Sequence, residues 1–181
     1  ISVIRLENLS IKCRNSNNNI DMVQFNGKYY VAFRTAPTHF ASKKTKIFII
    51  SSDDFKNWKY ETEFFVKADM REPRFSVFQN KLFFYFFEGG TSLFKFEPKH
   101  IWTSILSDSG WSSKIKTNLD GFVDWRFRTY DQKLYFSSYY GVNLYNKEHH
   151  ANLRLFTSED GINFQPISKE PQITEQGAEE G

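Results

Sequence analysis

The sequence contains very little cysteine, and what it lacks excludes several classes of protein. Its one cysteine, Cys13, cannot form an internal disulfide, and no CxxC pattern or His/Cys cluster indicates a zinc site. No apolar run is long enough to span a membrane. The net charge of +3 is small and the lysines and arginines are scattered, which argues against nucleic-acid binding. We therefore expect no metal, no cofactor, no nucleic-acid partner and no membrane span.

Aromatic residues, by contrast, are abundant, and they stand in a pattern that repeats. Aromatic side chains make up 18% of the chain. Residues 72–82 read EPRFSVFQNKL and residues 124–134 read DWRFRTYDQKL, so the two segments match at an offset of 52 residues. A third copy, NIDMVQFNGKY at 19–29, precedes the first of these by 53 residues, counted from Lys28 to Lys81. A repeat of this length predicts one structural unit that is stacked on its neighbours.

Each copy predicts a β-hairpin. A short, aromatic-rich run follows each lysine, namely YYVAF (29–33), LFFYFF (82–87) and LYFSSYY (134–140). These runs are typical of strands and too short for most helices. A polar turn stands before each lysine, and the first of them, Asn26-Gly27, is a strong two-residue hairpin signal.

The second half of each unit predicts two further strands joined by a turn. The segments are KIFIISSDDFKNW (46–58), HIWTSILSDSGW (100–111) and NLRLFTSEDGINF (152–164). Aspartate side chains favour such turns because they accept backbone N–H groups. Four strands in roughly fifty residues describe one blade of a β-propeller.

We therefore predict an all-β fold, a propeller of four-stranded blades with about three blades and the start of a fourth in this chain. The expected segments are an outer or closing strand at 1–18, blades at 19–71, 72–123 and 124–178, and the start of the next blade at 179–181. Because propellers typically close with about four to eight blades, we expect the remainder of the propeller to lie outside this chain.

The turns at 51–58 (SSDDFKNW) and 157–164 (TSEDGINF) resemble the Asp-box of sialidases, whose pattern is S-x-D-x-G-x-x-W. Phe55 stands where that pattern has glycine, and Thr157, Glu159 and Phe164 replace its serine, aspartate and tryptophan. The segments FNGKYYVAFR, ADMREPRFSV and DWRFRTYDQKLYFSSYYG are similar to parts of bacterial sialidase-like propellers. The resemblance covers residues 19–181 and implies a glycoside hydrolase with a glycan or small sugar as its substrate.

Four acidic residues are the candidate catalytic groups. In a propeller the first strand of every blade lines the central channel, so residues at the starts of these strands converge on one face. The candidates are Asp21, Glu72, Asp124 and Glu180, with Glu179 as the alternative to Glu180. Convergent charges in a poorly solvated pocket indicate a site, because they repel one another unless they are balanced or bind a ligand. Glycoside hydrolysis uses two such carboxyl groups, although sialidases use a tyrosine as nucleophile.

Five further residues are candidates for binding the substrate. If the protein acts as sialidases do, arginines bind the substrate carboxylate in a forked geometry, and Arg34, Arg71 and Arg126 are the candidates. His39 lies in the loop after the second strand, where it can reach over the pocket. Tyr139, or its neighbour Tyr140, can supply a phenol.

Structural roles are the alternative for several of these residues. Arg126, like Arg74 one repeat earlier, can pair with the acid two residues before it, and the tyrosines can pack between blades. Three functions therefore stay open: a glycoside hydrolase, a non-catalytic carbohydrate-binding propeller and a protein-interaction propeller.

Overall fold

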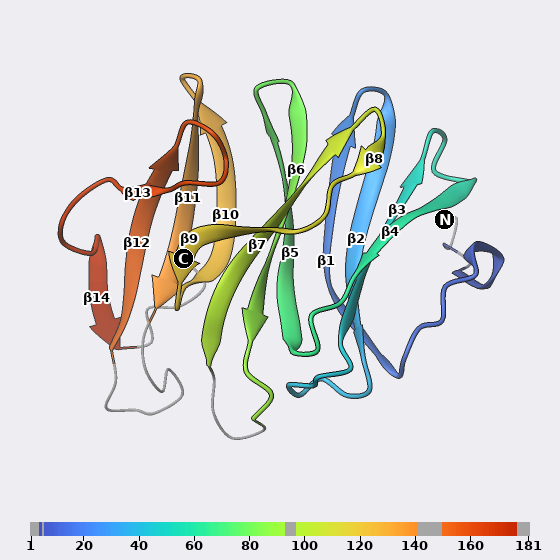
Figure 1. The fold of residues 1–181 in the computed structure, drawn as a ribbon, viewed down its shortest axis with the longest axis horizontal. Helices are drawn as coiled ribbons and strands as arrows, with labels where there is room; N and C mark the ends of the chain where they lie inside the picture. Colours follow the sequence, from blue (N-terminus) through green and yellow to red (C-terminus); the bar gives the residue numbers. More distant parts are fainter. Residues whose placement is uncertain (1–3, 5, 93–96, 141–149, 177–181) are drawn as a thin grey trace.

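The computed structural model describes residue 4 and residues 6–92, 97–140 and 150–176, and these residues form antiparallel β-sheets (Figure 1). One short 3-10 helix, η1 (Leu6–Leu9), precedes the first strand. The described residues contain no α-helix, and therefore none that could cross a membrane. The predicted all-β class is confirmed.

The strands form sheets that follow one another along the chain. The first sheet consists of β1 (Ser16–Phe25), β2 (Lys28–Ala36), β3 (Lys46–Ser52) and β4 (Trp58–Phe64). The second consists of β5 (Asp69–Phe78), β6 (Lys81–Gly89) and β7 (Pro98–Ser107), with β8 (Gly110–Trp111) and β9 (Ile115–Asp120) both paired to β7. The third consists of β10 (Val123–Tyr130), β11 (Lys133–Tyr140) and β12 (His150–Ser158), with β13 (Gln165–Pro166) and β14 (Ile173–Gln176) both paired to β12. Each sheet thus has four strand positions, and in the second and third sheets the outermost position is shared by two short strands.

A two-residue turn joins the first two strands of every sheet, as the repeat predicts. The closing pairs are Phe25 with Lys28, Phe78 with Lys81 and Tyr130 with Lys133. Both turn residues have a positive φ in each case, at Asn26 and Gly27, Gln79 and Asn80, and Asp131 and Gln132. Two successive positive φ angles define the type I′ turn, whose twist matches that of the flanking strands.

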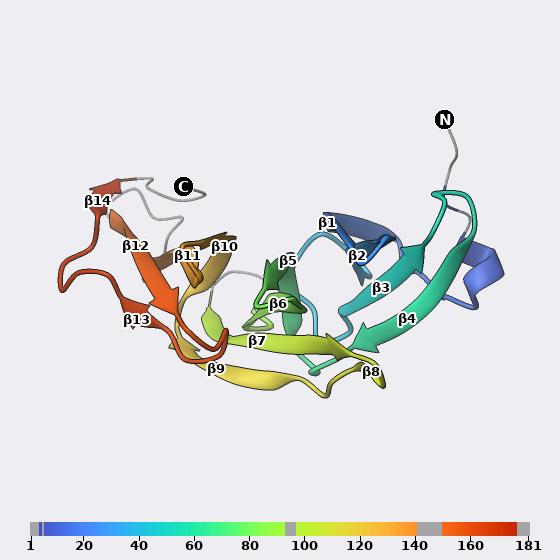
Figure 2. The same ribbon diagram turned by 90° about the horizontal axis from the view of Figure 1, so that it is seen from above.

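The three sheets fan out as blades from their first strands (Figure 2). The inner strands lie side by side, with β5 between β1 and β10. Aromatic rings fill the space between blades: Phe64 stacks on Phe84 at 5.3 Å between the ring centroids, and Tyr85 stacks on Phe127 at 3.9 Å. Burial of such large apolar surfaces is the main force that holds neighbouring blades together.

The turns that resemble the Asp-box have the same hydrogen bonds in the first and third blades. The Asp54 Oδ1 accepts the backbone N–H groups of Lys56 and Asn57 at 2.8 and 2.7 Å. The Asp160 Oδ1 accepts the backbone N–H groups of Ile162 and Asn163 at the same distances, 2.8 and 2.7 Å. These bonds to the charged form lower the pKa of both aspartates, that of Asp160 to about 2. The two aspartates therefore have a structural role in these turns.

Candidate functional site

Each inner strand contains a β-bulge close to its start. The pairing shifts by one residue between Asn18 and Ile20 in β1, between Arg71 and Arg74 in β5, and between Asp124 and Arg126 in β10. Asn19 and Glu72 lie in the first two bulges with φ angles of 47° and 49°. Bulges redirect side chains and often occur next to binding sites. We call this end of the inner strands the rim.

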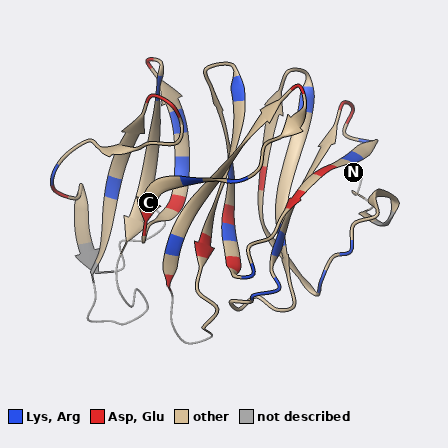
Figure 3. Ribbon diagram, in the orientation of Figure 1, with Lys and Arg blue, Asp and Glu red and all other residues tan. Residues whose placement is uncertain are grey.

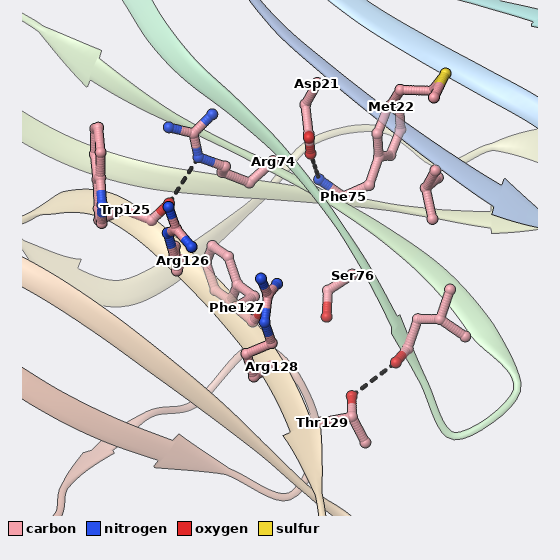
Figure 4. Close-up of a pocket in the computed structure, with 12 residues that line it drawn as sticks. Asp21, Met22, Arg74, Phe75, Ser76, Trp125, Arg126, Phe127, Arg128 and Thr129 are labelled. Carbon is pink, nitrogen blue, oxygen red and sulfur yellow. Dashed lines mark hydrogen bonds between the residues drawn. The ribbon is translucent and has the colours of Figure 1, made fainter. Parts of the chain in front are cut away.

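A groove of about 450 Å³ runs along the three inner strands from the rim toward the hairpin turns (Figure 4). The residues that line it belong to β1, β5 and β10: Asp21, Met22, Val23, Arg74, Phe75, Ser76, Val77, Trp125, Arg126, Phe127, Arg128 and Thr129. We call it the axial groove. Its charged side chains are three arginines and one aspartate, so the groove has a net positive charge.

Asp21 is the carboxyl group within the axial groove. It is half-buried, and its Oδ2 accepts the backbone N–H of Phe75 from the neighbouring strand at 2.7 Å (Figure 4). Burial raises the pKa of Asp21 above its ordinary value, although the N–H groups of Phe75 and Met22 and the charges of Arg74 and Arg128 oppose this shift. A carboxyl group with a raised pKa keeps its proton to a higher pH, as a general acid must.

Glu72 is the second carboxyl group, and it lies at the rim beside the groove. Its Oε1 accepts the Asn19 side-chain amide at 2.7 Å, and its Oε2 pairs with the Arg74 guanidinium at 2.7 Å. Arg74 also donates to the backbone carbonyl of Trp125 at 2.7 Å and lies over the indole ring at 5.1 Å. The pair Glu72–Arg74 therefore links all three inner strands at the rim. Figure 3 shows acidic and basic residues close together at this end of β5.

Two arginines of β10 contribute most of the positive charge in the groove. Arg126 and Arg128 are both exposed and line the axial groove (Figure 4). Within the described ranges Arg126 has no hydrogen bond or ion pair, and Arg128 donates to the carbonyl of the preceding residue, Phe127, at 3.0 Å. Their guanidinium groups are thus available to an anionic ligand.

Asp124 does not reach the axial groove. Its side chain is 0% exposed, and within the described part of the chain neither carboxyl oxygen has a hydrogen-bond partner. Burial raises the pKa of Asp124 well above its ordinary value, and the nearby charge of Glu72 acts in the same direction, whereas the charge of Arg74 and the backbone N–H groups of Asp124 and Phe87 act against it. A carboxyl group that no solvent or ligand can touch is not placed to react with a substrate.

Arg34 and Arg71 lie away from the axial groove, on either side of Asp69. Arg34 is 0% exposed, and each of its three guanidinium nitrogens donates to a protein acceptor. Its Nη2 pairs with the Asp69 Oδ1 at 2.7 Å, and the Arg71 Nε pairs with the Asp69 Oδ2 at 2.6 Å. All three guanidinium nitrogens of Arg34 are thus engaged by the protein itself, in a buried position away from the axial groove.

The remaining candidates are dispersed. His39 is exposed in the loop between β2 and β3 and lies against Asn18 at the rim. Tyr139 is buried in the core between the second and third blades, with its ring 6.5 Å from that of Trp125. Glu179 and Glu180 lie outside the described residues. No group of three or more His, Cys, Asp or Glu side chains that could hold a metal ion occurs in the described ranges.

Sequence reasoning missed Asp69, which binds two of the predicted arginines. The position 52 residues later is Gly121, so the repeat gives no signal there. For Arg74 and Arg128 a signal existed, because both stand in the repeated segment next to the predicted acids.

Comparison with known proteins supports the fold. No protein-family model matches the chain, and no curated protein matches it in sequence. Among solved structures, a family 117 glycoside hydrolase of the marine bacterium Zobellia galactanivorans has a TM-score of 0.62 at 17% identity, over 92% of this chain and 61% of its own. An α-L-arabinanase of Penicillium chrysogenum, complexed with arabinobiose, has a TM-score of 0.59 at 14% identity, over 86% of this chain and 52% of its own.

A third solved structure, the family 32 β-fructofuranosidase of Bombyx mori, has a TM-score of 0.56 at 13% identity, over 89% of this chain and 36% of its own. The chain therefore spans between about a third and three fifths of the length of these proteins. Their β-propeller fold confirms the predicted architecture of this chain. The similarity extends over several glycoside hydrolase families and does not single out sialidases.

Proposed function

We propose that the protein is a carbohydrate-active enzyme that hydrolyses a glycosidic bond in the axial groove. The observation that carries this proposal is the half-buried carboxyl group of Asp21, which lines a groove of about 450 Å³ close to a second carboxylate, Glu72, at the rim. Glycoside hydrolysis needs two carboxyl groups in different environments. The propeller fold that the chain shares with several glycoside hydrolases raises the expectation of this chemistry but does not fix it.

The environments of the two carboxyl groups suggest their division of labour. Asp21, whose pKa is raised by burial, fits the general acid, which gives its proton to the leaving oxygen as the glycosidic bond breaks. Glu72, which pairs with Arg74 as a carboxylate, fits the base that takes a proton from the attacking water. The Asp21 carboxyl group accepts the N–H of Phe75, which stands three residues after Glu72 on the same strand, next to the bulge of β5.

The charge of the groove favours an acidic sugar as the substrate. Among the described residues Arg126 and Arg128, which line the groove, form no ion pair with a carboxylate, and guanidinium groups bind carboxylates and sulfates through paired hydrogen bonds. A uronic acid, a sialic acid or a sulfated sugar supplies the missing negative charge.

A non-catalytic carbohydrate-binding propeller is the second candidate. Two observations favour it: the Asp21 Oδ2 is already engaged by Phe75, and the charge of Glu72 is already balanced by Arg74. Such a protein would bind the same acidic sugars in the same groove without turnover.

The experiment is turnover of a panel of chromogenic glycosides, acidic and neutral, by the full-length protein and by its Asp21→Asn variant. Asp131→Asn, the same change in an exposed hairpin turn, is the matched control. We expect Asp21→Asn to lose at least about 100-fold in kcat, the usual contribution of a general acid, while Asp131→Asn keeps wild-type kinetics.

If the folded wild type turns over no glycoside of the panel but binds one acidic sugar saturably, the proposal of a hydrolase would give way to that of a carbohydrate-binding propeller. Neither turnover nor binding, with a protein that copurifies, would favour the interaction propeller.

A further inference from the structure

The loop between β2 and β3, residues 37–45, is held to the rim by charged side chains. The Arg71 Nη2 donates to the His39 carbonyl at 2.9 Å, and the Arg34 Nη2 donates to the carbonyl of the next residue, Phe40, at 3.3 Å. Two consecutive carbonyls of an exposed loop are therefore bound by guanidinium groups. Hydrogen bonds from a charged donor are about twice as strong as neutral ones.

Asp69 fixes both of these arginines. Its side chain is almost fully buried, and each of its oxygens pairs with one guanidinium group, while Oδ1 also accepts the hydroxyl of Thr45 at 2.9 Å. Thr45 stands at the end of the loop, and its single hydroxyl proton is shared between Asp69 Oδ1 and the carbonyl of Ser42, which lies 2.8 Å away. We call Asp69, Arg34, Arg71 and Thr45 the loop clamp. The clamp joins the first blade and its loop to the first residues of β5.

The clamp also determines the hydrogen-bonding state of His39. Arg34 has only donors, so the Asn18 oxygen must face it, as the contact of 3.2 Å between Arg34 Nη1 and Asn18 Oδ1 shows. The Asn18 amide nitrogen, which also has only donors, then faces the His39 Nδ1 at 3.1 Å. Nδ1 must accept this bond, so the neutral ring carries its proton on Nε2. His39 thus offers an N–H donor at Nε2, for which no partner exists in the described residues.

The loop tip adjoins the catalytic rim of the proposed function. Asn18, which holds His39, is followed by Asn19, which donates to Glu72 at 2.7 Å. Beside His39 stands Phe40, whose side chain is 62% exposed although its carbonyl is held by the buried Arg34. An exposed ring on a fixed backbone and a fixed polar donor are the two elements with which proteins bind amphipathic ligands.

We propose that His39 and Phe40 form an outer subsite for a second sugar ring, and that the loop clamp positions it beside the axial groove. The Phe40 ring packs on the apolar C–H face of the sugar, and the His39 Nε2–H donates to one of its hydroxyl groups. Because the clamp fixes the loop before the ligand arrives, binding does not have to order it. This subsite rests on the proposed function, and it extends the substrate from a single sugar to an oligosaccharide.

The test is the affinity of the full-length protein for oligosaccharides of one to four units, drawn from a glycan array of acidic and neutral series. We expect affinity to rise between one and two units in the wild type, and Phe40→Ala to remove this rise with a loss of about tenfold. Binding of the single sugar should not change. Phe65→Ala, which truncates another exposed phenylalanine outside the loop, is the matched control and should bind as the wild type does.

A double-mutant cycle tests the clamp as a positioning device. Asp69→Asn should weaken binding of the two-unit ligand as Phe40→Ala does, and the double variant should be no weaker than either single one. A merely structural Asp69 would lower the melting temperature and leave the dependence on ligand length intact. Asp69→Glu keeps the carboxylate, so it should retain part of the dependence of affinity on ligand length that Asp69→Asn loses. Global destabilisation of the protein would not change this dependence.

The possible failures are distinct. Unchanged length dependence in Phe40→Ala, with the wild type still binding sugar, would overturn the outer subsite and leave the proposed function standing. Length dependence that Phe40→Ala removes but Asp69→Asn does not would overturn the role of the clamp. Absence of binding by the folded wild type across the array would overturn the proposed function and the subsite with it.

Discussion

The rim of β5 and the rim of β10 begin from nearly the same sequence and differ in what they present. Glu72 and Arg74 stand two residues apart in β5, and Asp124 and Arg126 stand two residues apart in β10. In β5 the acid and the arginine pair at 2.7 Å beside the groove. In β10 the acid is buried and its carboxyl oxygens have no hydrogen-bond partner among the described residues, whereas the arginine is exposed in the groove.

The bulges explain this difference. Glu72 lies within the bulge of β5, with a φ of 49°, whereas Asp124 still pairs in register with Ser138 and the bulge of β10 falls on the next residue. A shift of one residue in a strand turns a side chain to the opposite face of the sheet. The repeat therefore predicts where a charged residue stands along a strand but not which face it occupies. As a result, one blade supplies a balanced ion pair and the next supplies unpaired positive charge.

Exchange of each acid for its amide gives the largest expected contrast between the two rims. Glu72→Gln should lower kcat at least about 100-fold, because it removes the proposed base from the rim. The kcat of Asp124→Asn should stay within about a factor of two of the wild-type value, since the Asp124 side chain is not exposed to solvent. Steady-state kinetics with the best glycoside of the panel measure both. Equal losses would mean that the buried acid acts on the reaction after all.

Replacement of Arg74 by alanine should affect the stability of the protein more than replacement of Arg126. Replacement of Arg126 should have the larger effect on sugar binding. Arg74→Ala should lower the free energy of unfolding by about 2 kcal/mol, because it removes the guanidinium group that pairs with Glu72 and donates to the Trp125 carbonyl. Arg126→Ala should change it by less than about 0.5 kcal/mol, as is usual for an exposed side chain without partners. Urea denaturation gives these values. Titration with the acidic sugar should show at least a fivefold loss for Arg126→Ala, and no loss there would contradict the assigned role of the groove.

The smallest expected effect is a dependence of stability on pH that arises from the raised pKa of Asp124. Burial raises its pKa in the folded protein, so the folded state binds more protons than the unfolded state, and stability falls as the pH rises above the ordinary aspartate value. Asp124→Asn removes this dependence. We expect the variant to gain about 1 kcal/mol, or a few degrees in melting temperature, at pH 8 and little at pH 4. Calorimetry at both values is the measurement, and an equal change at the two would show that Asp124 is not protonated on folding.

Periodicity explains which features were predictable from the sequence. The 52-residue repeat predicted the strands and the two-residue hairpins because each copy carries its own turn residues and aromatic run. Among the candidate site residues, the sequence predicted that Asp21 and Arg126 lie near the propeller axis, and both line the axial groove. The roles of Arg34 and Arg71 depend on Asp69, a contact across 35 residues in the case of Arg34, and no local pattern records such a partner. The burial of Asp124 depends on where a bulge falls, which the repeat itself conceals.

The turn at Ser158–Asn163 differs from its counterpart in the first blade in one further respect, because Gly161 contacts the second blade. Its carbonyl accepts the hydroxyl of Tyr85 at 2.8 Å, and a Cβ on it would come within 2.6 Å of the Phe83 ring. In the first blade the equivalent position is Phe55, whose ring instead stacks on Tyr29 of its own blade at 3.8 Å. The blades are therefore not interchangeable modules. Anyone who recombines propeller blades by gene shuffling would have to move the second and third blades of this chain as one inseparable cassette.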